Sequence, residues 1–466
     1  MTWRSVTGFQ REAIPEIGVH GVDFFFGYCV GVVFMPQTDS LFSRRQFLTS
    51  SSLGLSALGI LSAFGNDDSP KNKSSSAGRT GRPRVAAINS VYRLRSHAYH
   101  IAGRFIHGYT RNGFHHQPPF DLVRMFNHQH PENDLGPRVC QIHDIELCSS
   151  IPEALGEKNG LDVDAVLLII EHGDYPLNDI GQVLYPRAEF FETIVEVFRR
   201  TGRSIPVFVD KHLSYDHRLA AKMVATSQEM KFGLMAGSSL PVTWRRPEIE
   251  PTLETPFREA VVAFGFDRGT VEIYLFHAFE VLQSMMERRR GGETGVKSVE
   301  FLQGDAVWQA GDAGRWSWRL LDAALSRCPG TNVGPIRENV LKPQAVMVEY
   351  LDGTRGCVLN LIEQTSEFAF AGTIEGRSEP ISSCFYLPAP PGARFFDPLT
   401  YNIEKFFAAG TPPYPVERTL LTSTLTDFAM QSLHQGSKRL SSPALGVKYA
   451  APADSGFFRG PYVDAG

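Results

Sequence analysis

One eight-residue run constrains the fold of this chain more than any other feature of its sequence. Residues 163–170 read VDAVLLII, and every side chain from Ala165 onward is apolar. A strand that is apolar on both faces is typical of the middle of a parallel sheet that has helices on both sides. The run therefore predicts an α/β domain built around a buried parallel strand.

Short apolar runs alternate with amphipathic stretches on either side of this strand. We expect the strands of the first domain at 85–88, 120–126, 145–148, 163–170, 205–209 and 232–235. The amphipathic stretch 187–201 predicts a helix that ends at Gly202. This alternation predicts an open, doubly wound parallel sheet, a Rossmann-like domain, over residues 84–240.

After Pro241 the strands become longer and helices become fewer. We expect strands at 260–264, 271–275, 297–302, 345–351, 357–363 and 368–374, with helices at 276–290, 399–409 and 419–435. Asp352-Gly353 is a turn between two of these strands. The pattern predicts an α+β domain with a large, mostly antiparallel sheet over 241–445, followed by a tail over 446–466.

The N-terminal region has the pattern of an export signal. Arg44 and Arg45 stand in the sequence SRRQFL, and the apolar run 53–64 follows. Paired arginines before a short apolar run are typical of the twin-arginine route. We expect a leader and signal over 1–65, with a start at Met35, and a linker over 66–83. The protein is then periplasmic or secreted, without a membrane span after the signal is removed, because about 12 apolar residues cannot cross a bilayer.

Charge and cysteine content exclude some classes of protein. The net charge is −4, so no overall basic field attracts nucleic acid. Five of the six cysteines follow the signal, and none forms a CxxC pair. We interpret them as buried small side chains, although oxidation of one pair such as Cys140 and Cys148 stays an alternative.

Polar side chains follow the predicted strands of the first domain. They are His97 and His100, His128 and His130, Glu171 to Asp174, and Asp210 to His212. Ligands of such sheets bind outside the carboxyl ends of the strands, where neighbouring strands lie about 4.8 Å apart. We expect these groups to converge on one small polar ligand.

The order of the elements resembles the glucose–fructose oxidoreductase, inositol dehydrogenase and rhizopine-catabolism family (Gfo/Idh/MocA). The resemblance is carried by 163–170, by PVFVDK at 206–211, by 273–281 with the following VKSVE, and by 403–436. It implies a Rossmann domain joined to a sheet domain, and oxidation of a sugar or polyol with NAD or NADP.

The resemblance also implies catalytic roles. Lys211 corresponds to the family's lysine beside the nicotinamide and the substrate, and His277 to its general base. The usual Glu-Lys-Pro is here Asp210-Lys211-His212, and Ile273 stands where the family has an aspartate before the histidine. We predict Lys211, His277 and Asp210 as catalytic residues.

The first turn departs from the family pattern. Residues 89–96 read NSVYRLRS and contain no glycine, whereas a dinucleotide-binding turn needs glycines so that the backbone can approach the pyrophosphate. Two arginines of the turn, Arg93 and Arg95, could still bind phosphate as in an NADP-type site. The cofactor-binding residues that we predict are Asn89, Arg93, Arg95, His128, Glu171 and His172.

Substrate contacts are predicted at Asp174, His212, Trp244 and Arg245, with a small carbohydrate or polyol as partner. Two alternatives stay open. The first is a nicotinamide-free isomerase or lyase in the same cleft, with a divalent metal on His172 and Glu171 as a weaker expectation. The second is a non-catalytic carbohydrate-binding protein. Homo-oligomerisation through the sheet domain is a further expectation.

Overall fold

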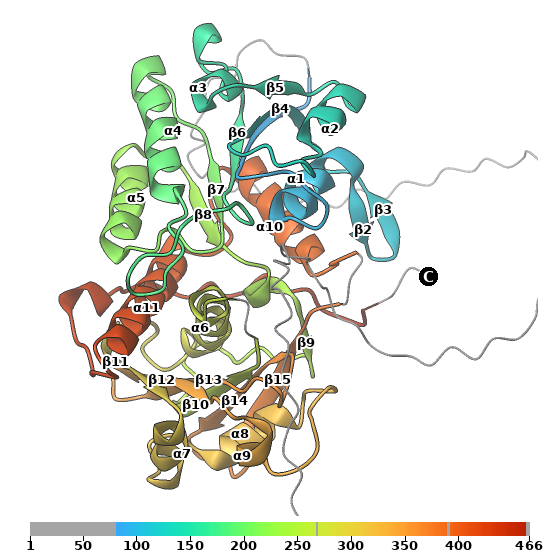
Figure 1. Ribbon diagram of the computed structural model, residues 1–466. Helices are drawn as coiled ribbons and strands as arrows, with labels where there is room; N and C mark the ends of the chain where they lie inside the picture. The colour runs from blue at the N-terminus through green and yellow to red at the C-terminus, as the bar shows by residue number, and fades with distance from the viewer. Residues whose placement is uncertain (1–80, 267–268, 389–391, 463–466) are drawn as a thin grey trace, which may run out of the picture. The chain divides into compact units, whose positions relative to one another are not determined.

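Six parallel strands form the first sheet, in the order β5-β4-β1-β6-β7-β8 (Figure 1). The computed structural model describes residues 81–266, 269–388 and 392–462. The strands are β1 (Arg84–Asn89), β4 (Asp121–Asn127), β5 (Glu146–Cys148), β6 (Ala165–Ile169), β7 (Val207–Asp210) and β8 (Leu234–Gly237). All five residues of β6 are buried, as the apolar run predicts.

Helices cover both faces of this sheet. Alternate residues of β1 and β6 face two separate cores, because successive side chains of a strand point to opposite faces. One core is closed by α1 (His97–His107) and α10 (Phe396–Ala409), and the other by α4 (Arg187–Thr201) and α5 (His217–Glu229). The bounds of α4 match the prediction, and Gly202 ends it with φ 66°.

The second sheet has seven strands in the order β11-β12-β13-β10-β14-β15-β9. Its neighbours pair antiparallel, except that β10 and β13 run parallel. The strands are β9 (Trp244–Arg246), β10 (Phe257–Phe264), β11 (Val296–Gln303), β12 (Gln344–Tyr350), β13 (Arg355–Asn360), β14 (Phe368–Ile374) and β15 (Ile381–Tyr386). Together the two sheets confirm the predicted fold class.

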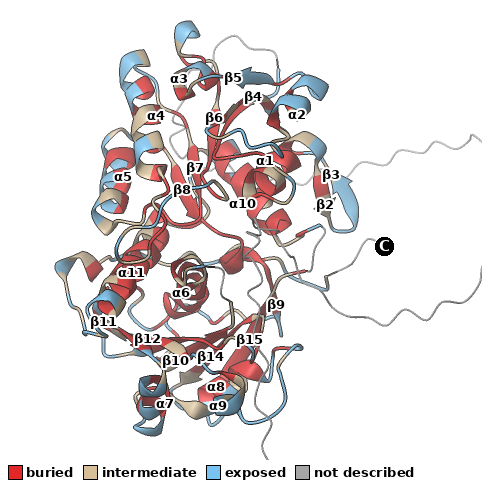
Figure 2. Ribbon diagram, in the orientation of Figure 1, coloured by how far each residue is buried: buried red, intermediate tan, exposed pale blue. Residues whose placement is uncertain are grey.

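Helices also cover the second sheet on both faces. On one face lie α6 (Glu272–Met286) and α11 (Val416–His434), and on the other α7 (Asp305–Asp312) and α8 (Trp318–Leu325). Figure 2 shows that the middle strands of both sheets and the inward sides of these helices are buried, whereas the edge strand β5 is largely exposed. The α6 helix is buried almost throughout and lies between the second sheet and α11.

The predicted strand at 271–275 is wrong, because this segment is the first turn of α6. Val271 and Ile273 are β-branched, and that composition favours a strand. Tertiary packing decides otherwise: Leu275, Phe279 and Leu282 recur at helical spacing and pack on the second sheet.

Several smaller elements have no counterpart in the sequence prediction. They are β9, β15, α7, α8, the four-residue helix α9 (Ile336–Asn339) and a hairpin of β2 (Tyr109–Arg111) and β3 (Phe114–His116). Short elements carry too few periodic residues to be recognised from one sequence.

The C-terminal helices return to the first sheet. Leu399 and Ile403 of α10 belong to a core of that sheet, while α11 contributes Val416 to the first sheet and Leu421 to the second. From Ala77 onward the chain forms one compact unit. The domain boundary between 240 and 241 therefore stays a prediction.

The leader, signal and most of the linker lie outside the described residues, as does Cys29. The other five cysteines are free and buried, which agrees with their interpretation as small core side chains. Among the described helices, none combines the length and hydropathy needed to cross a membrane.

Candidate active site

Glu171 is the centre of a buried charged cluster beyond the end of β6. Its Oε1 lies 2.9 Å from a guanidinium nitrogen of Arg187 and 3.1 Å from Nζ of Lys211, and the Tyr185 hydroxyl donates to Oε2 at 3.1 Å. Burial alone would raise the pKa of Glu171, but Lys211 and Arg187 hold that pKa well below its usual range. The carboxylate therefore stays charged and fixes the Lys211 ammonium.

Two residues at the strand ends have left-handed backbone. His172 has φ 61° and Lys211 has φ 64°, a conformation that costs non-glycine residues energy. The Lys211 amide donates to the Gly237 carbonyl at 3.1 Å, which fixes this turn. Strained backbone of this kind recurs at functional sites, although this chain also has it elsewhere, for example at Asn112 and Glu363.

His212 and Glu272 connect this cluster to α6. His212 Nε2 lies 3.1 Å from Nη1 of Arg187 and 3.6 Å from Oε1 of Glu272, and the other Glu272 oxygen accepts from the Val183 amide. Burial, followed by the charge of Arg187, lowers the pKa of His212. Burial raises the pKa of Glu272 to about 7.

His277 on α6 belongs to the same electrostatic environment. Its Nδ1 lies 3.0 Å from the Ser238 hydroxyl and 3.5 Å from Oε2 of Glu280, and Ser238 donates to Glu280. Burial lowers the pKa of His277, and the charge of Lys211 lowers it further. The hydrogen bond with Glu280 raises this pKa but does not outweigh burial. His277 is therefore a neutral imidazole at pH 7, able to accept a proton.

Asp210 is paired with a histidine from the start of α1. Its Oδ2 lies 2.6 Å from Nδ1 of His97, and the Asp210 side chain is fully buried while that of His97 is 13% exposed. A buried carboxylate behind an imidazole orients that ring for proton transfer. The sequence places His97 after the first strand, but only the fold pairs it with Asp210.

Three buried polar atoms of the cluster have no hydrogen bond: Nε of Arg187, Oδ1 of Asp210 and Oε1 of Glu272. Buried polar groups are nearly always hydrogen-bonded, so an exception needs an explanation. Three exceptions around one lysine are consistent with a site that binds a polar molecule.

The residues of the first turn do not form a cradle for a dinucleotide. Ser90, Val91 and Tyr92 are at most 1% exposed, so their side chains are packed inward. The N-terminus of α1 is capped from within the chain, because Ser96 accepts from the Tyr99 amide at 3.1 Å and His172 Nδ1 accepts from the His97 amide at 3.2 Å. These are the amides that would otherwise face a pyrophosphate.

The other predicted cofactor residues are also engaged with the chain itself. Asn89 donates to Asn127 at 3.1 Å, and Arg93 reaches the His172 carbonyl at 3.5 Å. Arg95 has a partly exposed side chain and φ 64°. His128 contacts the Tyr175 hydroxyl at 2.9 Å.

Trp244 and Arg245 lie on β9 and contact the C-terminal segment. The Trp244 ring meets Phe458 and Tyr462 edge to face, and Arg245 donates to the Ser455 hydroxyl at 3.3 Å. Both side chains line a shallow pocket together with residues 460–462. Within the described part of the chain, no contact joins them to the Lys211 cluster, so the structure does not bring these two predicted residues into it.

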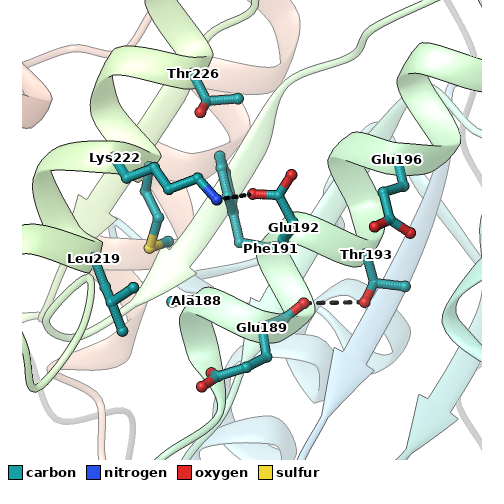
Figure 3. A pocket seen from close by; sticks show the side chains of 10 residues that line it. Ala188, Glu189, Phe191, Glu192, Thr193, Glu196, Leu219, Lys222 and Thr226 are labelled. Atoms are coloured by element: carbon teal, nitrogen blue, oxygen red, sulfur yellow. Dashed lines mark hydrogen bonds and ion pairs between the residues drawn. The ribbon is translucent and has the colours of Figure 1, made fainter.

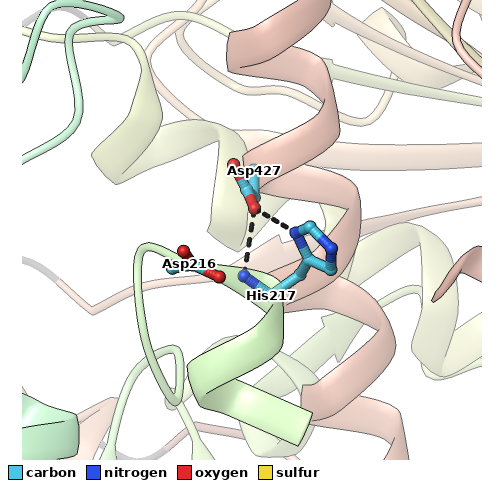
Figure 4. Close-up of side chains that lie close together, drawn as sticks. All are labelled: Asp216, His217 and Asp427. Atoms are coloured by element: carbon cyan, nitrogen blue, oxygen red, sulfur yellow. Dashed lines mark hydrogen bonds and ion pairs between the residues drawn. The ribbon is translucent and has the colours of Figure 1, made fainter.

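Across the residues that the structure describes, Glu171 and His172 do not belong to a group of three or more side chains whose potential metal-ligand atoms lie close together. Among the described residues, three other side chains gather such atoms: Asp216, His217 and Asp427 (Figure 4). His217 Nδ1 lies 2.6 Å from Asp427, and Asp216 caps α5 and pairs with Arg218. These atoms already hold α5 against α11, so we interpret the group as structural.

Another pocket lies between α4 and α5 on the outer side of the first sheet (Figure 3). Glu192 and Lys222 face each other across it at 2.9 Å. None of the predicted site residues lines this pocket.

The comparisons with known proteins give weak similarity only. No family model and no curated protein matches the sequence. GenD2 from gentamicin A biosynthesis, solved with NAD, has 12% identity and a TM-score of 0.48 over 78% of this chain and 97% of its own. Myo-inositol 2-dehydrogenase from Lactobacillus plantarum has 10% identity and a TM-score of 0.48 over 77% and 99%.

Myo-inositol dehydrogenase from Lactobacillus casei, solved with NAD(H) and myo-inositol, has 9% identity and a TM-score of 0.48 over 78% and 97%. At these sequence identities and TM-scores, the activities and ligands of the three proteins cannot be assigned to this chain.

Glu272 gives a pH-dependent prediction. Because its folded-state pKa of about 7 exceeds the ordinary value of 4.5, the folded protein binds more protons than the unfolded chain between these two pH values. The free energy of unfolding should therefore fall as pH rises from about 4.5 to about 7, with a contribution from Glu272 of up to about 3 kcal/mol. Urea unfolding at several pH values measures this, and Glu272→Gln should remove that contribution. Identical profiles for wild type and variant would contradict it.

Proposed function

We propose that this chain is an enzyme that transfers protons at a hydroxyl-bearing carbon of a sugar or polyol. Two features support the proposal: Lys211 is held 3.1 Å from Glu171, and the charge of Lys211 contributes, after burial, to the lowered pKa of His277. A fixed cation and a neutral base are the two groups that such a reaction needs.

Each group has a separate role in this proposal. The Lys211 ammonium donates a hydrogen bond to a substrate oxygen and stabilises the charge that develops there. His277 accepts the proton that leaves the substrate, and Ser238 orients the ring. Asp210 orients the His97 ring, because its Oδ2 lies 2.6 Å from Nδ1 of His97. Asp174, which is exposed at the same edge of the sheet, would contact substrate hydroxyls.

Two versions of this chemistry are candidates. The sequence resemblance implies an oxidoreductase, in which a tightly bound NAD or NADP would accept a hydride. The closed first turn favours a nicotinamide-free isomerase or lyase, in which a proton leaves a carbon next to a substrate carbonyl or carboxylate. In the isomerase a proton is returned to the same or another atom, and in the lyase a neighbouring hydroxyl group leaves as water with a proton. The second version needs no oxidant.

Solvent exchange separates these versions. Wild-type protein is incubated with a panel of inositols, aldoses and uronic acids in D2O, with and without NAD and NADP. Deuterium that appears in a carbon–hydrogen bond without nicotinamide supports the isomerase or lyase. Nicotinamide reduction by any member of the panel supports the oxidoreductase. Sugar binding that survives Lys211→Ala and His277→Ala, without either reaction, would support a carbohydrate-binding protein instead.

We also propose that the protein acts outside the cytoplasm, on the basis of Arg44 and Arg45 followed by the apolar run 53–64. Replacing both arginines with lysine should leave unprocessed protein in the cytoplasm. Fractionation with immunoblotting measures this, and replacement of Arg82 and Arg84 with lysine is the matched control. Unchanged export of the double-lysine protein would contradict the proposal.

A further inference from the structure

The loop after β6 lies directly over the first turn. The Tyr175 hydroxyl donates to the Ser90 hydroxyl at 3.2 Å and lies 2.9 Å from His128 Nδ1. The rings of Tyr175 and His128 are stacked at an interplanar angle of 10°. Ser90 is the first residue after β1, and its exposure is 0%.

A second pair of contacts closes the same loop onto the loop after β4. Gln129 donates to the Asp174 carbonyl at 2.9 Å, and the Asp174 amide donates back to the Gln129 side chain at 2.8 Å. The backbone N–H of Gln129 in turn donates to the Ser90 carbonyl at 2.8 Å. The two loops, which follow the strands on either side of β1, are thereby tied together above the first turn. We name Ser90, His128, Gln129, Asp174 and Tyr175 the clasp.

Gly173 shows how closely the two segments approach. A Cβ atom at this position would lie 3.0 Å from the Cβ of Ser90 and would collide with the Tyr175 ring. The backbone of the β6 loop is therefore in contact with the first turn. In a dinucleotide-binding sheet, the cofactor's pyrophosphate lies above the first turn, against the N-terminus of the following helix.

We infer that the clasp occupies the pyrophosphate position and excludes NAD and NADP from this crevice. The contacts are reciprocal and come from three strand ends, and His172, from the same loop, caps the helix that would receive the phosphates. The inference selects between the two versions of the proposed function and leaves the roles of Lys211 and His277 unchanged.

Calorimetric titration of the wild-type, full-length exported protein with NAD, NADH, NADP and NADPH tests the exclusion. No saturable binding is expected up to millimolar nucleotide. One-to-one binding of any of the four by wild-type protein would overturn the inference. Because solvent exchange into a sugar needs no nucleotide, it can succeed or fail independently of this result.

Hydrogen exchange tests whether the hydrogen bonds of the clasp form in solution. The Asp174 amide should be protected in wild type and should exchange about fivefold faster in Gln129→Ala, the factor expected for one hydrogen bond. Gln228→Ala removes an exposed glutamine that bonds Glu417 and is the matched control. Tyr175→Phe is a second variant, which removes the hydroxyl from Ser90 and His128 without changing the ring. An Asp174 amide that exchanges equally fast in all four proteins would overturn the clasp assignment.

Discussion

Replacing Lys211 with methionine is expected to slow solvent-deuterium exchange into the substrate by at least about a hundredfold. The ammonium lies 3.1 Å from Glu171 and is fixed by the left-handed backbone at its own residue. Methionine fills a similar volume but donates no hydrogen bond to a substrate oxygen. The exchange rate per enzyme, followed by proton NMR, measures this effect.

A loss of rate could also follow from a loosened fold, so two further variants accompany Lys211→Met. Lys211→Arg keeps the positive charge beside Glu171 but places a planar guanidinium where a compact ammonium stood, and it should be slowed almost as much. Lys222→Met removes a lysine between α4 and α5 and should react at the wild-type rate. A Lys211→Met enzyme with a wild-type rate would show that Lys211 has no part in the chemistry.

Arg418→Met is expected to lower the free energy of unfolding by about 3–5 kcal/mol. Arg418 on α11 forms two hydrogen bonds with Glu287, at 2.6 and 2.8 Å, and both side chains are at most 1% exposed. Removing the guanidinium leaves Glu287 buried with the Tyr449 hydroxyl as its remaining partner. An uncompensated buried charge is costly, whereas loss of an exposed ion pair is not.

The matched control is Arg459→Met, which removes a partly exposed arginine paired with Glu250 and Asp454. Its effect should stay below about 1 kcal/mol. Chemical denaturation of the three proteins measures both values. Equal destabilisation by the two variants would mean that the Arg418 pair does not hold α11 against the end of α6.

The sequence determines the first sheet well because its strands carry strong, regular signals. The apolar run at 163–170 predicts a central strand, and β6 lies within it. The helix at 187–201 is delimited by Gly202, whose positive φ ends it. In the second domain, by contrast, Val271 and Ile273 predict a strand where packing on the second sheet makes a helix.

The site is only partly predictable from the sequence. Glu171, Lys211 and His212 come together because they follow neighbouring parallel strands, a rule that needs only the strand order. Tyr185 precedes α4 and Arg187 is its first residue, and neither carries a local signal of its contact with Glu171. The pairing of His97 with Asp210 joins residues 113 positions apart and depends on the fold itself.

The first turn shows the limit of motif analysis. The missing glycines predict that a pyrophosphate fits poorly, but they do not reveal what occupies the position instead. Gln129 and Asp174 lie in loops 45 residues apart and have no motif in common. Only the tertiary structure shows that these loops are bonded to each other above Ser90.

Native mass spectrometry of the protein purified from its own compartment tests the central claim most directly. The Lys211 cluster beside a closed first turn predicts the mass of the polypeptide alone, or of the polypeptide with a molecule of sugar size. One NAD or NADP retained per chain would contradict a nicotinamide-free crevice.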